Sequence, residues 1–333
     1  MRIGLAGVGR IGAFHAGTLC QLPAVDSVIV TDADPARARA VAGQLGAEAA
    51  QTADELLDSG LDALVVATAT DAHPEFIVRG IKAGLPVFCE KPVAADISGT
   101  LEVIAQAAAG HAPVQIGFQR RFDAGYAAAR AAVRSGRLGW LHTLRATTLD
   151  PAPPPPGYVA SSGGLFRDCS VHDFDIIRWV TGREVSEVYA LGTNRGADFF
   201  REAGDVDTMA AVLTLDDGTI ALVSNTRYNA AGYDVRLEVL GSAGSIGAGL
   251  DDRLPLPSAE PGAAFPAGPA YANFVDRFSA AYRAELAAFV HLAAEGGPSP
   301  CTMADALEAF YVAEACELSR ARHVPVAVAE VRQ

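Results

Sequence analysis

Apolar runs alternate with helical patterns along residues 1–118, and this alternation predicts a parallel sheet. Each run is short and nearly continuous, as is typical of strands buried on both faces. Strands connected through helices form βαβ units, so the sequence predicts a doubly wound sheet. The predicted strands are residues 2–6, 25–32, 61–68, 85–91 and 112–118, and the predicted helices are one after the turn at 7–12 and those at 33–45, 53–59, 74–83 and 97–109.

After Phe118 the strand-like stretches follow one another with a single helix between them, which favours an antiparallel sheet of at least five strands. Asp216-Asp217-Gly218 has the composition of a hairpin turn, and Gly182 is a stop signal for the interrupting helix. Residues 255–269 are rich in alanine, glycine and proline, and we expect them to be mobile or ordered by a partner. The strand-like stretches are 139–149, 185–194, 208–215, 219–228 and 233–241, and helices are predicted at 170–182, 273–295 and 302–322.

The fold class predicted from these patterns is α/β, with an N-terminal Rossmann domain followed by an α+β domain. The Rossmann domain, a doubly wound parallel sheet, is expected at residues 1–119, and the α+β domain with a mostly antiparallel sheet at 120–333. The C-terminal helices are available to pack back on the first domain.

Composition narrows the class of protein. The chain has 333 residues, 50% of them hydrophobic and 20% charged, which is enough for two domains. Its net charge of −13 repels phosphates, so we expect no nucleic-acid partner. No apolar run reaches the roughly 18 residues of a membrane helix, and the five cysteines contain no C-x-x-C pair. These features favour a cytoplasmic protein with a small-molecule partner.

The segment Gly7-Val8-Gly9-Arg10-Ile11-Gly12 lies between the first predicted strand and its helix, as a dinucleotide-binding turn requires. In that context Gly7 allows the tight turn, Gly9 lets backbone approach a pyrophosphate, and Gly12 lets the helix pack close to the strand. The helix N-terminus then offers N–H groups and a positive dipole end to phosphates. The alternative is a tight turn without a ligand.

Asp32 ends the second predicted strand, 20 positions after Gly12 (32 minus 12). There its carboxylate can accept a hydrogen bond from an adenosine ribose and repel a 2′-phosphate, which favours NAD over NADP. Asp32 could instead cap the next helix, and Arg37 and Arg39 could reach a phosphate. Ligands of such sheets bind beyond the carboxyl ends of the strands. The predicted cofactor-binding residues are Gly7, Gly9, Arg10, Ile11, Gly12, Asp32, Thr68, Thr70, His73, Glu90, Lys91 and Gln119.

Lys82 and Lys91 are the two lysines among 26 basic residues, so the lysine at the end of strand 85–91 needs an explanation. At the carboxyl edge of the sheet it would stand beside the nicotinamide end of NAD. Its ammonium can donate to a substrate hydroxyl and, unlike arginine, can lose a proton. Pro92 restricts Lys91 to an extended backbone. The alternative is a surface lysine in a loop.

Asp168, His172 and Asp175 form a second candidate group, because residues three and four apart share a helix face. A carboxylate near an imidazole orients it and raises its basicity, which suits a base that takes a proton from an alcohol. Asp168 could instead cap the helix, and the acids could form a solvated face. We expect no metal site, because a third strong ligand group is missing. The other histidines except His73, including His15, are expected to be ordinary structural residues.

Several motifs in this order resemble the Gfo/Idh/MocA oxidoreductases, and among them the inositol 2-dehydrogenases. They are the glycine turn, FCEKPVA, GFQRRFDAGY, the Asp-x-x-x-His spacing at 168–172, GYDVRLEVLGSAGSI, and the late helices DRFSAAYRAELAAFV and EAFYVAEAC. The resemblance extends over nearly the full chain. It implies a Rossmann domain followed by a large open-faced antiparallel sheet that is often used to build dimers or tetramers.

The resemblance also implies roles for individual residues. His172 would be the general base, Lys91 and Asp168 would assist it, and a hydride would pass from the carbinol carbon to nicotinamide C4. Thr148 stands where the family pattern would place an inositol-contacting histidine, and Gln119 where it would place a methionine. Arg120 or Arg121 matches a family arginine. The substrate-binding residues implied in this way are Lys91, Arg121, Thr148, Asp168, His172, Asp175 and Tyr233.

The function predicted from the sequence is an NAD-dependent dehydrogenase that oxidises a secondary hydroxyl of a cyclic polyol or sugar to a ketone. Two alternatives stay open: a sugar or anhydrosugar dehydrogenase or reductase of the same family, and a non-catalytic NAD(P)-binding sensor. The set of Lys91, Asp168 and His172 speaks against the sensor, because a binding module needs no proton-transfer residues. An exposed sheet face also predicts a homo-oligomer, a dimer or tetramer.

Overall fold

The computed structural model describes residues 1–108 and 110–332. The chain forms two compact units: unit 1 contains residues 1–119 and 282–307, and unit 2 contains residues 120–281 and 308–333. The boundary after Gln119 lies where the strand pattern changes. Residues 282–307, which the sequence analysis places in the second domain, belong to unit 1. Both boundaries of this segment fall within long helices. These helices are α10 (Phe274–Glu295) and α11 (Met303–Arg322).

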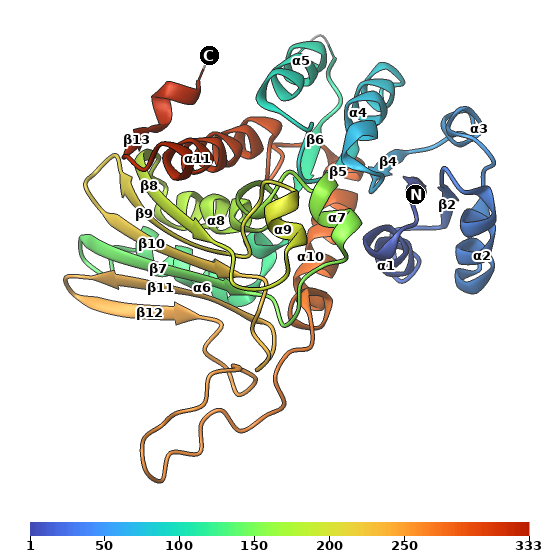
Figure 1. The fold of residues 1–333 in the computed structure, drawn as a ribbon. Coiled ribbons are helices and arrows are strands. Elements are labelled where there is room, and N and C mark those ends of the chain that lie inside the picture. Colours follow the sequence, from blue (N-terminus) through green and yellow to red (C-terminus); the bar gives the residue numbers. More distant parts are fainter. Residues whose placement is uncertain (109, 333) are drawn as a thin grey trace. The chain divides into compact units, whose positions relative to one another are not determined.

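Unit 1 is built on a six-stranded sheet in which all strands are parallel, in the order β3-β2-β1-β4-β5-β6 (Figure 1). The prediction of a doubly wound parallel sheet is therefore confirmed. The strand order reverses between β1 and β4, and the carboxyl ends of these strands carry the glycine turn and the loop at residues 67–73. The strands are β1 (Arg2–Ala6), β2 (Ser27–Thr31), β3 (Glu48–Ala49), β4 (Ala63–Val66), β5 (Val87–Glu90) and β6 (Val114–Gly117).

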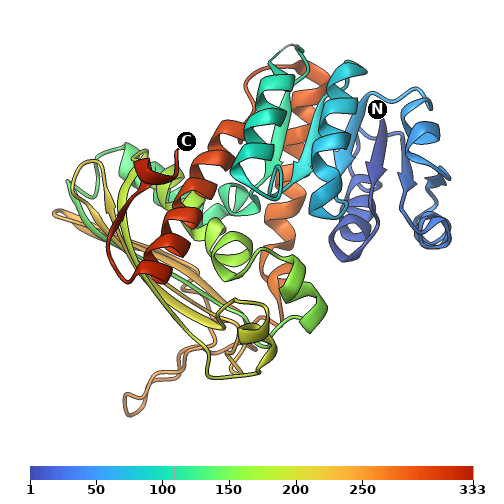
Figure 2. The same cartoon turned by 45° about the horizontal axis from the view of Figure 1, so that its top comes forward.

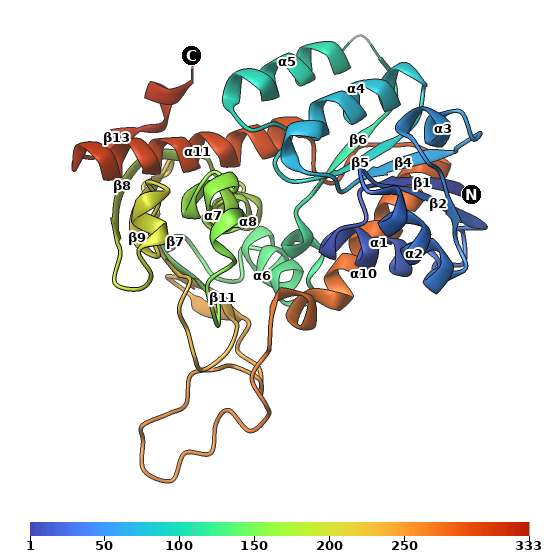
Figure 3. The same cartoon turned by 45° about the vertical axis from the view of Figure 1, so that its right-hand side comes forward.

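Helices cover both faces of this sheet (Figure 3). One face carries α1 (Arg10–Leu19), α2 (Pro35–Leu45) and the unit 1 part of α10, and the other carries α4 (His73–Lys82) and α5 (Ile97–Ala107). The predicted end of the last of these helices, Ala109, lies outside the described residues. Unit 1 also contains α3 (Ala53–Leu57) and the 3₁₀ turn Thr70–Ala72.

Side chains of α1 and α10 fill the core on their face of the sheet. Leu5, Phe88, Leu286 and Phe289 are fully buried in one apolar cluster, and the ring centroids of Phe88 and Phe289 lie 5.7 Å apart. Burial of such side chains is the main stabilising term of a domain of this size. The core therefore depends on residues from both ends of the chain.

Unit 2 contains a seven-stranded sheet in the order β12-β11-β7-β10-β9-β8-β13. Its strands pair antiparallel except β7 and β10, which are parallel neighbours. The predicted mostly antiparallel sheet is confirmed, and its hairpin turn at Gly218 has the positive φ of 85° that glycine adopts readily. The two short edge strands β12 and β13 were not predicted from the sequence. The strands are β7 (Leu141–Leu149), β8 (Val185–Thr193), β9 (Thr208–Leu215), β10 (Ile220–Thr226), β11 (Asp234–Gly241), β12 (Gly244–Ala248) and β13 (Val326–Ala327).

Helices of unit 2 lie on one face of this sheet (Figure 2). Of the helices described in this unit, none covers the opposite face, where Tyr189, Val212 and Leu222 remain exposed. Helix α6 escaped prediction although Asp123 is a clear N-cap, accepting from the N–H groups of Gly125 and Tyr126. The remaining elements are α6 (Ala124–Arg134), α7 (Pro156–Ser161), a π-helical turn (Phe166–Ser170), α8 (Val171–Thr181), α9 (Phe199–Glu202) and the 3₁₀ turns Gln119–Phe122 and Val328–Val331.

The segment between β12 and α10, which contains the alanine, glycine and proline-rich stretch, has neither helix nor strand. Within the described part of the chain, no helix combines the length and the hydropathy that crossing a membrane would take.

Candidate active site

The glycine turn at the carboxyl end of β1 owes two of its glycines to packing within unit 1. Gly7 has a φ of +88°, and a Cβ there would lie 2.6 Å from the oxygen of Ala67. A Cβ at Gly12 would lie 1.8 Å from the oxygen of Gly7, so α1 can approach β1 only with glycine at this position. A Cβ at Gly9 would meet no protein atom within 4 Å. Gly9 is the N-cap of α1, and its bare backbone suits the close approach of a pyrophosphate.

Asp32 holds the glycine turn from the end of β2. Its Oδ2 accepts from the N–H of Val8 at 2.8 Å, and its Oδ1 accepts from the N–H of Asp34 at 2.9 Å. The Nη1 of Arg37 lies 3.3 Å from the same Oδ1, and the side chain of Arg37 is half-exposed. Asp34, and not Asp32, caps α2, because it accepts from the first-turn N–H groups of that helix. The arrangement leaves Asp32 at the strand end where a ribose hydroxyl would bind.

His73 connects two of the loops at the carboxyl edge of the sheet. Its Nδ1 lies 2.7 Å from the carbonyl oxygen of Pro92 and its Nε2 lies 3.2 Å from that of Thr68. Burial lowers the pKa of this imidazole, so it is neutral near pH 7 and has one N–H to donate. The sequence predicted His73 as a cofactor contact, whereas the structure shows both ring nitrogens beside carbonyl groups of unit 1.

The remaining residues predicted to bind the cofactor lie along the same edge. Arg10 and Ile11 form the first turn of α1, Thr70 begins the 3₁₀ turn after β4, and Gln119 is buried just after β6.

Lys91 directly follows β5 and is half-buried. The Oε1 of its neighbour Glu90 lies 2.7 Å from the Nε2 of His15. His15 is a fully buried residue of α1. The imidazole also packs edge-on against Phe88 and Tyr282, with ring centroids 5.7 Å away in both cases. Sequence reasoning missed this role of His15. Its place three positions after Gly12, on the inward side of the helix, was the available signal.

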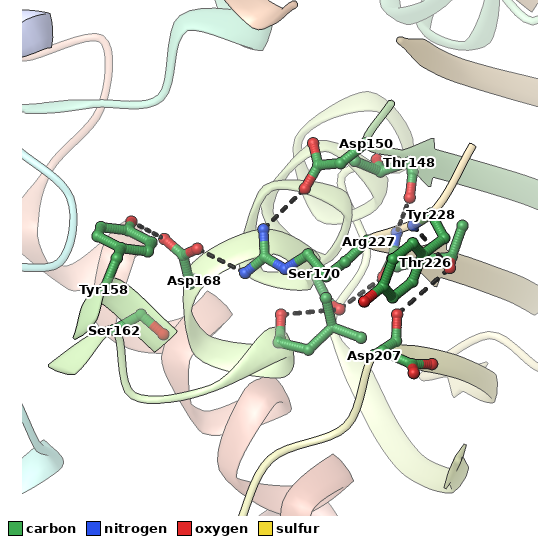
Figure 4. A network of polar contacts seen from close by, with 12 residues as sticks. Thr148, Asp150, Tyr158, Ser162, Asp168, Ser170, Asp207, Thr226, Arg227 and Tyr228 are labelled. Carbon is green, nitrogen blue, oxygen red and sulfur yellow. Dashed lines mark hydrogen bonds and ion pairs between the residues drawn. The ribbon is translucent and has the colours of Figure 1, made fainter. Parts of the chain in front are cut away.

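In unit 2, Asp168 and His172 lie on one continuous helical segment. The π-helical turn that contains Asp168 runs directly into α8, whose first residues include His172. Such turns are frequent at functional sites. The N-cap of α8 is Ser170, so Asp168 does not cap this helix. Instead its carboxylate accepts from Tyr158 at 2.8 Å and from Arg227 at 2.7 Å (Figure 4).

Asp173, one residue after His172, is the centre of a buried polar network. Its carboxylate accepts from Arg120 at 2.5 Å, from Asn225 at 2.7 Å and from the hydroxyl of Thr148 at 2.9 and 3.0 Å. Thr148 is 1% exposed, and its hydroxyl also accepts from Arg120 at 2.9 Å. The resemblance implied Thr148 as a substrate contact, whereas the structure shows its hydroxyl bound to these two side chains.

Arg121 and Asp175 form a buried, two-pronged ion pair, with contacts of 2.9 Å from Nε and 2.5 Å from Nη2. Such charge-assisted pairs are strong and geometrically specific. Tyr233 is also buried, and burial raises the pKa of its hydroxyl, which therefore stays protonated.

The predicted site residues thus fall into two groups. Gly7, Asp32 and Lys91 belong to unit 1, while Asp168, His172, Asp175 and Tyr233 belong to unit 2. Among the described residues, no group of three or more histidine, cysteine or acidic side chains is arranged to hold a metal ion.

The parallel sheet, the glycine turn and the acidic residue at the end of β2 define unit 1 as a dinucleotide-binding domain. Residues 1–118 match the model of the oxidoreductase family with an NAD-binding Rossmann fold, and residues 126–247 match that of the GFO/IDH/MocA C-terminal domain. The chain belongs to the Gfo/Idh/MocA oxidoreductase family.

Relatives match the chain over nearly its whole length. It is 40% identical to the myo-inositol dehydrogenase Hyg17 of Streptomyces leeuwenhoekii, over 98% of this chain and 100% of that protein. It is 34% identical to an inositol 2-dehydrogenase of Rhizobium meliloti, over 99% of both chains. Among solved structures, scyllo-inositol dehydrogenase of Lactobacillus casei with bound NAD(H) and scyllo-inositol is 31% identical, with a TM-score of 0.87 over 99% of both chains. A probable dehydrogenase of Thermotoga maritima is 34% identical, with a TM-score of 0.93 over 99% of this chain and 100% of the other.

Proposed function

We propose that the protein oxidises a secondary hydroxyl of a cyclic polyol, of the myo-inositol type, to a ketone with NAD as cofactor. The observation that carries this proposal is the near-full-length similarity to dehydrogenases named for inositol, one of them with NAD(H) and scyllo-inositol bound. The fit of Gly9 and Asp32 to a dinucleotide supports the choice of cofactor. NAD, when bound, supplies the acceptor for the hydride.

His172 acts as the general base in this proposal and takes the proton from the substrate hydroxyl. Asp168 stands four residues before His172 on the same helical segment, and its negative charge favours the protonated form of the imidazole as the proton arrives. Lys91 donates to the substrate oxygen from the end of β5. Holding these groups and the carbinol carbon in place makes the proton transfer effectively unimolecular, which supplies much of the acceleration.

The other substrate hydroxyls require fixed donors and acceptors. Asp175, held by Arg121, offers carboxylate oxygens, and Tyr233 offers a hydroxyl that burial keeps protonated. Thr148 contributes indirectly, because its hydroxyl is bound to Asp173 and Arg120. The recognition of a polyol therefore rests on few, rigid polar groups, as is usual for small-molecule sites.

The test follows NADH formation by the purified protein with myo-inositol, scyllo-inositol, glucose, xylose and levoglucosan at mildly alkaline pH, with NADP as a parallel control. We expect turnover of an inositol with NAD. Preferential turnover of a sugar would keep the catalytic roles and replace the substrate. Binding of NAD without turnover of any polyol would contradict the proposed substrate class.

We further propose that the protein is a homo-oligomer, a dimer or tetramer, assembled through the open face of the sheet in unit 2. Tyr189, Val212 and Leu222 stand side by side there, 37%, 41% and 40% exposed, in register with the ion pair of Arg145 and Glu238. Apolar rows bordered by charges are typical of subunit interfaces.

Analytical ultracentrifugation of the wild type and of Leu222→Lys tests this assembly. We expect an oligomer that the substitution weakens or dissociates. Leu101→Lys is a matched control, because Leu101 is 36% exposed on unit 1 and lies outside this face. A monomeric wild type at micromolar concentration would contradict the proposal. A cytoplasmic location also stays a proposal, supported by the free cysteines Cys20, Cys89, Cys169, Cys301 and Cys316.

A further inference from the structure

Arg227 and Asp150 lie side by side because β7 and β10 are parallel neighbours. Leu149, the last residue of β7, is in register with Thr226, the last residue of β10. Asp150 directly follows β7 and Arg227 directly follows β10. Both side chains therefore start from the same end of these two strands. The N–H of Asp150 donates to the oxygen of Thr226 at 2.9 Å, which continues the pairing to this point.

Arg227 bridges two carboxylates beyond the ends of these strands. Its Nη1 donates to Asp150 at 2.8 Å and its Nη2 donates to Asp168 at 2.7 Å (Figure 4). The second oxygen of Asp168 accepts from the hydroxyl of Tyr158 at 2.8 Å. Each oxygen of Asp168 thus has a defined donor, and a planar guanidinium imposes a fixed geometry on one of them.

The charge balance of this cluster depends on Arg227. The side chains of Arg227, Asp168 and Asp150 are only 7%, 12% and 21% exposed, so solvent screens them weakly. Burial raises the pKa of Asp150, Arg227 opposes this rise, and the charge of Asp168 adds to it. The nearby Cys169 thiol has a pKa raised by burial and stays neutral, while the positive charge of Arg120 also opposes the rise in the pKa of Asp150. Without Arg227, two carboxylates would face each other in a poorly solvated place.

We propose that Arg227 is a positioning residue for the reaction: it fixes the orientation of Asp168 and balances its charge beside His172, and Asp150 tunes the strength of this interaction. This inference rests on the proposed function. A purely structural role, in which Arg227 only fastens the ends of β7 and β10, makes different predictions, because such a role affects folding and leaves the proton affinity of the site unchanged.

The experiment compares Arg227→Gln, Arg227→Lys and Asp150→Asn with the wild type. Arg178→Gln is the matched control, because Arg178 is also buried and makes two contacts with one carboxylate, that of Glu184, at 2.6 and 2.8 Å. For each protein, the folded fraction, NAD affinity and the pH profile of kcat/KM for the preferred polyol are measured. The titration of the His172 imidazole is followed by NMR and assigned with His172→Ala.

Loss of the positive charge in Arg227→Gln favours protonation of His172, which must be deprotonated to act as the general base. We therefore expect the acid limb of the profile and the His172 titration to move up by about one pH unit, and kcat to fall at least about tenfold with unchanged NAD affinity. Asp150→Asn removes a negative charge, so both should move down. Arg227→Lys keeps the charge, so both should stay near the wild type, while kcat falls because an ammonium cannot bridge two carboxylates as a planar fork does.

Equal loss of activity in Arg227→Gln and Arg178→Gln, with unshifted profiles and titrations, would overturn the inference in favour of a structural role. If Arg227→Gln does not fold, Asp150→Asn decides, with Arg227→Lys as the charge-preserving reference: no downward movement of the profile and the titration in Asp150→Asn overturns the inference. If the wild type oxidises no polyol, the proposed function fails, and the NMR titration still decides on Arg227.

Discussion

Replacing Gly12 with alanine should separate the packing role of the glycine turn from its role in cofactor binding. The new Cβ would lie 1.8 Å from the oxygen of Gly7 and 3.3 Å from the Cβ of Ala67. A backbone oxygen cannot yield as a flexible side chain does, so α1 must move away from β1. Overpacking of this severity costs about 3 kcal/mol, the upper end of the range found in protein cores.

The same displacement should weaken cofactor binding, because it moves the N–H groups of the first turn of α1. A loss of about 2.7 kcal/mol in binding corresponds to about a 100-fold weaker affinity for NAD. Urea unfolding without NAD measures the first effect, and calorimetric titration with NAD measures the second. The wild type and the variant are compared at the same pH and salt concentration.

Two matched variants in the same segment sharpen the test. Gly9→Ala adds a Cβ that meets nothing within 4 Å, so stability should change by less than about 1 kcal/mol while NAD binding weakens. Gly17→Ala places its Cβ 3.5 Å from Leu45, an ordinary contact, and should stabilise α1 by roughly 0.5 to 1 kcal/mol. Wild-type stability of Gly12→Ala, or equal destabilisation of Gly9→Ala and Gly12→Ala, would refute this reasoning.

Three further predictions concern single side chains. His172→Ala should retain NAD affinity in calorimetry and lose about 10² to 10⁴ in kcat, as expected when a general base is removed; near-wild-type turnover would exclude His172 from that role. Thr148→Val should lower the free energy of unfolding in urea by about 1 to 3 kcal/mol, because the buried Asp173 loses a donor; unchanged stability would contradict the importance of this bond. Because burial lowers the pKa of His73 from 6.5, the unfolded chain binds more protons below that pH, and stability should decrease as pH falls through this range. His73→Asn should remove this part of the pH dependence of urea unfolding, and identical slopes in both proteins would show that His73 does not contribute it.

The sequence predicted those features that depend on neighbouring residues. Gly7, Gly9 and Gly12 act within one strand, turn and helix, so their spacing alone indicated the turn that the structure contains. The same holds for the Asp216-Asp217-Gly218 hairpin and for the stop of α8 at Gly182, which has a φ of 68°. Helix α6 was missed although its signals, Asp123 before an alanine-rich segment, were equally local.

Features that depend on distant pairing could not be predicted from the pattern. Arg227 and Asp150 are 77 positions apart, and only the parallel pairing of β7 with β10 makes them neighbours. The direction of the Thr148 hydroxyl depends in the same way on Asp173, which belongs to a different element. His15 and Glu90 are 75 positions apart, so the inward position of His15 on its helix could not indicate which residue it contacts.

Unit 1 is discontinuous along the chain, and this has a consequence for its synthesis and for its use as a fragment. The sheet ends by residue 119, but Leu286 and Phe289, which complete its core, belong to a segment that begins 163 positions later (282 minus 119). A ribosome therefore releases the whole sheet long before the part of α10 that completes its core exists, and the nascent domain exposes apolar surface meanwhile. A gene fragment that ends at Gln119 should aggregate, whereas one that joins residues 282–307 to it carries the missing part of the core.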